Sequence, residues 1–152
     1  MVVQRGVGGG RWCLVALALG CLACTPEPDD ATPEGALRLF LEAMERSEWD
    51  AEAREEAYRL LGSETRARLR TRARRAEGLA RRELAPWDVL VQGSFRLRFT
   101  PNDAATKVAT TEGDRATVVV RGRGEGQRAE VPMVRERGKW RVALRLPPLS
   151  SP

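Results

Sequence analysis

The spacing of apolar residues changes once along this chain, and the change limits the fold classes open to it. Up to about residue 80 apolar residues recur every three or four positions, which is typical of amphipathic helices. From about residue 95 they alternate with polar residues, as in Phe95-Arg96-Leu97-Arg98-Phe99, which is typical of half-buried strands. Helices followed by an antiparallel sheet constitute the α+β class.

Three helices are expected before the change. The first begins at Thr32-Pro33-Glu34, which supplies an N-cap, a proline at the first helical position and an early carboxylate. The second follows Trp49-Asp50 and ends at Gly62, and Ser63 then caps the third. The third helix has a narrow apolar stripe of small residues, made of Leu69, Ala73, Ala76 and Ala80.

Four strands are expected after the segment 95–99, over 107–111, 116–123, 127–136 and 139–146. The turns between them are short, which favours antiparallel hairpins. In the last strand the side chains expected to face the helices are Trp140, Val142, Leu144 and Leu146. Pro132 lies in mid-strand, which favours an edge or a bulge over a central position.

The N-terminal stretch has the pattern of an export signal. Arg5 and Arg11 supply a positive start, and the apolar run from Cys13 to Leu22 follows. A membrane-spanning helix needs about 20 apolar residues, and this run is shorter. All three cysteines of the chain lie between Trp12 and Cys24, so a disulfide framework in the exported part is excluded.

The end of this signal resembles the lipobox of bacterial lipoproteins, in which small or aliphatic residues precede a lipidated cysteine. Cys24 follows Leu22-Ala23, and Cys21 follows Leu19-Gly20. The resemblance implies lipidation at Cys24, with Cys21 as the alternative, and an ordinary secretory signal remains a second alternative. Cleavage before Cys24 divides the chain into a signal peptide, an acidic and proline-bearing tether, one α+β domain and a tail, over 1–23, 24–31, 32–147 and 148–152.

Histidine is absent from the chain, which removes a histidine-based triad and the commonest metal ligand. No zinc, EF-hand or Walker-type spacing is present. We therefore expect no enzyme, no metal site and no cofactor. The net charge of +5 falls to +3 when Arg5 and Arg11 leave with the signal, which is a mild excess.

The third helix carries a set of arginines that could bind anionic surfaces such as lipid headgroups or envelope polymers. The set is Arg66, Arg68, Arg70, Arg72, Arg74 and Arg75, with Arg81 and Arg82 beyond it. The alternative, which the sequence favours, is a solvated helix whose arginines pair with acids of the first two helices. Those acids are Glu42, Glu45, Glu48, Asp50, Glu52, Glu55 and Glu56. Nucleic acid is not an expected partner, because no stacking aromatics are interleaved with these arginines.

Two further groups of residues have a functional and a structural interpretation. The alternation predicts arginines on the outer sheet face, where solubility explains them: Arg96, Arg98, Arg121, Arg141 and Arg145. The candidate pocket residues are Tyr58, Trp87 and Asp88, although Tyr58 also fits the core and Asp88 a turn cap. Trp49 and Trp140 are expected as core anchors, and 122–126 as a hairpin turn.

The order of elements resembles the cystatin-like or nuclear-transport-factor-2-like fold. The segment 32–37 resembles the opening helix of its lipoprotein members, and 134–142 resembles their closing hairpin. The resemblance implies N-terminal helices packed on a curved antiparallel sheet around a conical pocket.

The expected function is that of a non-enzymatic binding or structural domain, lipid-anchored in the bacterial cell envelope and facing the periplasm from the outer membrane. Its partner would be the membrane through the lipid, together with an envelope protein or polymer. Alternatives are a small-molecule-binding or weakly catalytic pocket, and an electrostatic binder acting through the arginine-rich helix.

Overall fold

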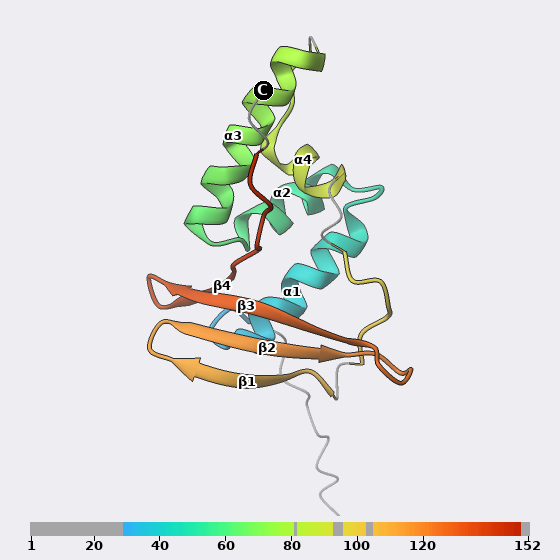
Figure 1. Ribbon diagram of the computed structural model, residues 1–152, viewed down its shortest axis with the longest axis vertical. Coiled ribbons are helices and arrows are strands. Elements are labelled where there is room, and N and C mark those ends of the chain that lie inside the picture. The colour runs from blue at the N-terminus through green and yellow to red at the C-terminus, as the bar shows by residue number, and fades with distance from the viewer. Residues whose placement is uncertain (1–28, 81, 93–95, 103–104, 150–152) are drawn as a thin grey trace, which may run out of the picture.

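The computed structural model describes residues 29–80, 82–92, 96–102 and 105–149; the predicted signal peptide, Cys21 and Cys24 lie outside them. Within these residues the chain forms four helices followed by a four-stranded antiparallel sheet, which confirms the α+β class (Figure 1). The helices are α1 (Pro33–Arg46), α2 (Ala51–Arg59), α3 (Ser63–Ala80) and α4 (Pro86–Gln92). The strands are β1 (Lys107–Glu112), β2 (Arg115–Arg121), β3 (Arg128–Glu136) and β4 (Lys139–Val142).

The three predicted helices are present, and side-chain caps explain where α1 and α2 begin, whereas Ser63, predicted to cap the third helix, is the first residue of α3. The Thr32 hydroxyl accepts a hydrogen bond from the Gly35 N–H at 3.1 Å, at the start of α1. Asp50 caps α2 in the same way, accepting from the Glu52 N–H at 2.8 Å. The sequence analysis did not predict α4, because seven residues are too few for a periodic stripe to show.

The sheet is a meander with the strand order β1-β2-β3-β4, as the short turns predict. The predicted strand over 95–99 is wrong for its described part, since residues 96–99 form bends and coil. The last strand is also shorter than predicted and ends at Val142. Residues 143–149 instead run beside α3, where the Pro147 carbonyl accepts a hydrogen bond from Arg72.

Pro132 lies one residue before the part of β3 that pairs with β4, which begins at Met133. It is opposite Thr117 of β2 in an unbroken register, so β3 contains no bulge there. Its carbonyl accepts from the Ala143 N–H at 2.8 Å, one residue beyond the end of β4. The proline therefore occupies a locally unpaired edge, which fits the missing N–H. The sheet's irregularity lies in β1 instead, between Val108 and Thr110.

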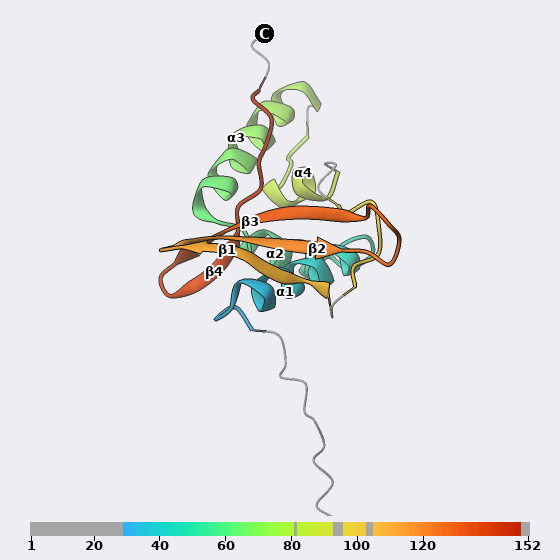
Figure 2. The same ribbon diagram turned by 60° about the horizontal axis from the view of Figure 1, so that its bottom comes forward.

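Helix α1 packs on one face of the sheet, here called the inner face, whose side chains include Val118, Val120 and Met133. The other helices pack mainly on one another and on α1. Figure 2 shows α1 on one side of the sheet and α3 rising on the other. The expected packing of the N-terminal helices on the sheet is therefore wrong for α2, α3 and α4: α1 covers the sheet, and these three helices form a second group.

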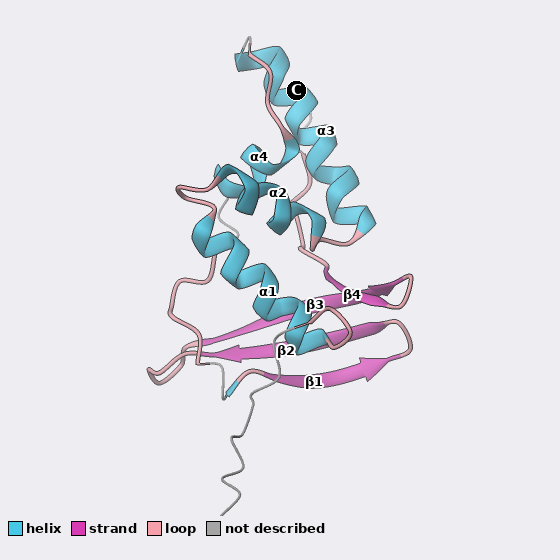
Figure 3. Cartoon of the chain, turned by 180° about the vertical axis from the view of Figure 1, so that it is seen from behind, coloured by secondary structure: helices cyan, strands magenta, loops and turns pink. Residues whose placement is uncertain are grey.

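The chain between α2 and α3 closes the outer edge of β4. The Val142 N–H donates to the Leu60 carbonyl, and the Gly62 N–H donates to the Val142 carbonyl, each at 2.9 Å. Figure 3 shows this connection between the helical group and the sheet from behind. These backbone bonds fix the first turn of α3 against the end of the sheet.

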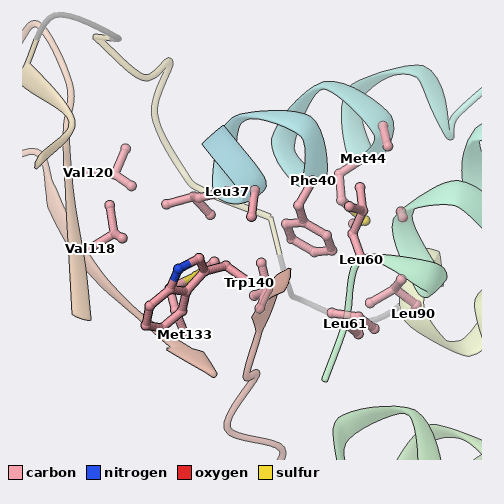
Figure 4. Packing of buried hydrophobic residues seen from close by; sticks show 14 of the residues in the cluster. Leu37, Phe40, Met44, Leu60, Leu61, Leu90, Val118, Val120, Met133 and Trp140 are labelled. Atoms are coloured by element: carbon pink, nitrogen blue, oxygen red, sulfur yellow. The ribbon is translucent and has the colours of Figure 1, made fainter. Parts of the chain in front are cut away.

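The space between α1 and the inner face is filled by large side chains (Figure 4). Leu37 and Phe40 of α1 meet Met133 and Trp140 of the sheet, and each of these side chains is at most 5% exposed. Trp140 is thus a core anchor, as predicted. Trp49 is not, since it is 70% exposed in the turn between α1 and α2, outside the inward stripe of either helix.

No helix of the described residues is long and apolar enough to cross a bilayer.

Candidate functional site

Tyr58 of α2 and Trp87 of α4 are in aromatic contact, and the Tyr58 hydroxyl bonds two residues of α3. Their ring centroids are 5.9 Å apart, with the planes inclined at 65°, which is the favoured edge-to-face arrangement. The Tyr58 hydroxyl donates to the Arg66 carbonyl at 3.3 Å and accepts from Arg70 Nη1 at 3.1 Å. The half-buried ring with a polar rim is the arrangement that the sequence favoured for Tyr58.

Asp88 caps the start of α4, as the sequence suggested. Its Oδ2 accepts from the Ala85 N–H at 3.1 Å, while the Asp88 N–H donates to the Ala85 carbonyl at 3.0 Å. Its other oxygen lies 3.8 Å from Arg54 Nη1 of α2. Both carboxylate oxygens therefore make structural contacts, one at the start of α4 and one beside α2.

A groove of about 540 Å³ lies between α3 and α4. Trp87 and Asp88, from the candidate pocket, line it together with Arg70 and Arg74, from the candidate arginine surface. Tyr58 lies behind it and holds Arg70. The two candidate sets, which the sequence kept separate, therefore meet in one place.

Two glutamates of this groove, Glu77 and Glu83, were not among the residues predicted from the sequence. Glu77 accepts from the Leu84 N–H at 3.0 Å, which ties the end of α3 to the loop before α4. Glu83 is exposed on that loop and also lines the groove. A glutamate that accepts from a loop N–H seven residues later leaves no periodic pattern in the sequence. The contact therefore could not be predicted from residue spacing.

The α3 arginines do not pair with the acids of α1 and α2, and that alternative is wrong for the described residues. Arg66 lies 3.8 Å from Glu136 of β3, and Arg68 bonds Glu64 of its own helix at 2.6 Å. Four arginines have no carboxylate within 4.0 Å in the described part of the chain: Arg70, Arg72, Arg74 and Arg75.

Four of the seven acids that were expected to meet α3 have other basic partners among the described residues. Arg46 lies 2.7 Å from Glu56 and 3.6 Å from Asp50, and Arg59 lies 2.8 Å from Glu55. Glu48 pairs with Arg96, which comes from the segment after α4. The pKa values of Arg46 and Arg59 are raised, chiefly by the hydrogen bonds that these arginines donate to Glu56 and Glu55. More than half of the acids that α3 was expected to meet are thus paired elsewhere.

The predicted outer-face arginines are placed differently from one another. Arg121 of β2 and Arg141 of β4 lie on strands, on the face opposite Val118 and Val142. The other three lie outside the strands: Arg96, Arg98 and Arg145. The shared arginine face is therefore wrong, because the strand over 95–99 is absent in its described part and β4 is short.

Two partly buried carboxylates join distant parts of the chain. Burial opposes ionisation of Asp30, but hydrogen bonds from Arg141 and Lys139 outweigh it, so the pKa of Asp30 is lowered. The same balance lowers the pKa of Glu136, where burial is outweighed by hydrogen bonds from the Ser63 N–H and hydroxyl. Asp30, placed by sequence in the tether, is thus attached to β4, with its carbonyl accepting from the Trp140 N–H at 2.8 Å.

Another groove, of about 740 Å³, lies between the first turn of α3 and the outer face of the sheet. Its charged lining alternates in sign and includes Arg68, already paired with Glu64, and Arg115 beside Glu112. None of the candidate pocket residues lines it. We therefore take the α3–α4 groove and the adjoining arginines as the candidate site.

The described residues hold no cluster of acids or cysteines arranged to bind a metal ion. No family model, curated protein or solved structure matches the chain.

Proposed function

We propose that this chain is a lipid-anchored, non-enzymatic binding domain of the bacterial cell envelope, which binds anionic envelope surfaces through α3. The lipid attaches to Cys24, or to Cys21, and the domain faces the periplasm from the outer membrane. The export pattern and the lipobox resemblance support this address. A tethered domain remains close to anionic polymers and headgroups, so modest affinity is sufficient.

The unpaired charge of α3 carries the proposal. Arg70, Arg72, Arg74 and Arg75 lie within two turns of one helix and meet no carboxylate among the described residues. Arg70 and Arg72 donate to uncharged oxygens, those of Tyr58 and Pro147. These bonds position the guanidinium groups and leave their positive charge uncompensated.

The shape of the molecule also favours this surface. The C-terminal half of α3 projects beyond the other elements in all three ribbon views (Figures 1 to 3). Leu79, near its end, is 84% exposed. A projecting helix can contact a flat or extended partner without interference from the sheet.

The fold part of the proposal is a cystatin-like or nuclear-transport-factor-2-like domain with a curved sheet. Helices that precede an antiparallel meander, and α1 packed on its inner face, support it. The second helical group and the filled space beneath α1 distinguish this chain from the expected open cone.

Binding to vesicles tests the α3 surface. A variant with Arg70, Arg72, Arg74 and Arg75 changed to Gln is compared with a control that loses four exposed arginines elsewhere, Arg98, Arg115, Arg123 and Arg135. Each basic side chain near an anionic surface contributes about 1 kcal/mol, so the α3 variant should bind phosphatidylglycerol vesicles more than about thirtyfold more weakly. Equal losses in both variants, or no binding by the unmodified protein, would refute the assignment.

The anchor is tested separately by the intact mass of membrane-extracted protein. Loss of the lipid mass in Cys24→Ser, with retention in Cys21→Ser, is the expected result. An unmodified soluble product would remove the membrane part of the proposal and leave the α3 surface to be judged on the vesicle experiment.

The α3–α4 groove favours a second candidate function, the binding of a small molecule beside Trp87. A bound compound would shift the Trp87 indole N–H signal in a nuclear magnetic resonance titration with amino sugars and amino acids. No shift with any of these, at millimolar concentration, would count against this candidate.

A further inference from the structure

Three basic side chains surround a depression of about 490 Å³ on the outer face of the sheet. They are Lys107 of β1, Arg121 of β2 and Arg128 of β3. The remaining lining is apolar, and no carboxylate lines the depression in the described part of the chain. It lies at the end of the strands away from the α3 first turn, so it is separate from the candidate site above.

The strand register forces two of these charges together. Arg121 and Arg128 are direct cross-strand partners in the β2–β3 pair, and Lys107 is opposite Val119, two residues from Arg121. Like charges directly opposite one another destabilise a sheet. The arrangement therefore costs folding free energy unless something negative lies between the strands.

The chain itself compensates this charge only in part. Arg128 pairs with Glu130 at 2.7 Å, but both side chains are more than half exposed, where an ion pair contributes little. Lys107 and Arg121 have no carboxylate within 4.0 Å among the described residues. Two positive charges thus remain at the rim.

The floor of the depression is apolar. Val119 is 8% exposed there, and Ala109, at the irregular step of β1, also lines it. The three basic side chains around this floor are exposed, so their charged groups are accessible to an anion from solution.

We propose that this depression binds a phosphate group, held by Arg121 and Arg128, with Lys107 as the third contact. Guanidinium groups match phosphate oxygens in pairs, and lysine adds a point charge. Solubility alone, the earlier interpretation of Arg121, does not require two arginines to be directly opposite each other. This site is independent of the α3 proposal and can exist without it.

The test measures thermal unfolding and isothermal titration with inorganic phosphate, at an ionic strength held constant with sodium chloride. The unmodified protein should show a saturable rise in melting temperature. Arg121→Gln should bind phosphate at least about tenfold more weakly, which corresponds to the loss of one charged contact. Without phosphate it should be as stable as the unmodified protein or more so, because the like-charge pair is gone.

Arg115→Gln is the matched control. Arg115 lies on the same strand and the same face, and its removal changes the net charge equally, but it is opposite Val134. It should keep the phosphate response. If Arg121→Gln fails to fold, Lys107→Gln replaces it, with the same expected loss. A response that does not saturate, or one that is equal in Arg121→Gln and Arg115→Gln, would overturn the site.

Two arms distinguish the source of the phosphate. Both use the protein with the four α3 arginines changed to Gln, so that the other surface does not contribute. Saturable binding of inorganic phosphate with no vesicle binding indicates a free ligand. Phosphatidylglycerol vesicle binding that inorganic phosphate displaces indicates a headgroup, and either result supports the site.

Discussion

Glu136 joins the end of β3 to the first turn of α3 through Ser63. Its Oε1 accepts from the Ser63 N–H at 2.7 Å and from the Ser63 hydroxyl at 2.8 Å. The second oxygen lies 3.8 Å from Arg66, one turn further along the helix. The carboxylate that caps α3 therefore belongs to a residue 73 positions after Ser63 in the sequence.

Glu136→Ala should destabilise the fold by about 1–3 kcal/mol, because it leaves the first turn of α3 without its acceptor. Glu130→Ala is the control, since the Glu130 pair with Arg128 is exposed and should contribute less than about 0.5 kcal/mol. Urea denaturation followed by circular dichroism measures both. Equal changes in the midpoint would show that the cap is unimportant.

Stability should fall at acid pH as Asp30 and Glu136 are protonated. Both folded-state pKa values lie below their ordinary values of 3.8 and 4.5. A lowered folded pKa contributes stability above the unfolded pKa and loses it as pH falls through the folded one. The free energy of unfolding should therefore be nearly independent of pH above about 5.5 and fall below it. The double variant Asp30→Asn, Glu136→Gln should show a flatter acid limb.

Tyr58→Phe should keep the ring contact with Trp87 and lose the two hydrogen bonds to α3. We expect a cost of about 0.5–1.5 kcal/mol and weaker vesicle binding, because Arg70 loses its positioning partner. Trp87→Phe, which retains Arg70 bonding, should affect stability without changing the salt dependence of binding. Identical salt dependence in all three proteins would show that the hydroxyl does not position Arg70.

The two tryptophans misjudged as equivalent should respond differently to truncation. Trp140→Ala should cost about 3–5 kcal/mol, as for other buried aromatic residues. Trp49→Ala should change stability by less than about 0.5 kcal/mol, because the side chain is 70% exposed. Chemical denaturation of the pair would reveal an unrecognised contact if Trp49→Ala proved the costlier change.

Two exposed glycines give opposite expectations for the same substitution. Gly78, near the end of α3, has open space around it and no positive φ, so Gly78→Ala should stabilise the protein by about 0.5 kcal/mol. Gly113, in the β1–β2 turn, has φ +58°, so Gly113→Ala should destabilise it by about 1 kcal/mol. Melting temperatures that shift in the same direction would contradict this account.

The parts of the fold that were predicted correctly are those with local signals. Thr32 and Pro33 mark the start of α1 because capping is decided within four residues. The turns at Gly113 and Gly138 mark two hairpins, and both glycines have positive φ. Such features depend on neighbours in the sequence and leave a pattern there.

The errors concern contacts between distant residues. Residues 143–146 alternate as a strand would, yet they leave the sheet and run beside α3, where Leu146 is buried. The partners of the α3 arginines were also predicted wrongly, since Glu48 pairs with Arg96 and Glu56 with Arg46. Nothing in the spacing of either segment distinguishes these arrangements.

The residues of the candidate site could be predicted from the sequence, but their arrangement could not, because it depends on contacts between distant residues. Tyr58, Trp87 and Asp88 could be chosen by residue type, and the arginines by their number. Their meeting in one groove depends on α4, a helix too short to be seen in the sequence.

The backbone bonds of Leu60 and Gly62 to Val142 have a consequence for self-association. Together with the bond from the Trp140 N–H to Asp30, they occupy the outward backbone groups of β4. A second chain cannot add a strand there without displacing the connection between α2 and α3. Growth of the sheet by edge-to-edge polymerisation is thus left to β1 and to the part of β3 that β4 does not cover. The irregular step between Val108 and Thr110 makes the first edge a poor template, and the missing N–H of Pro132 weakens the second.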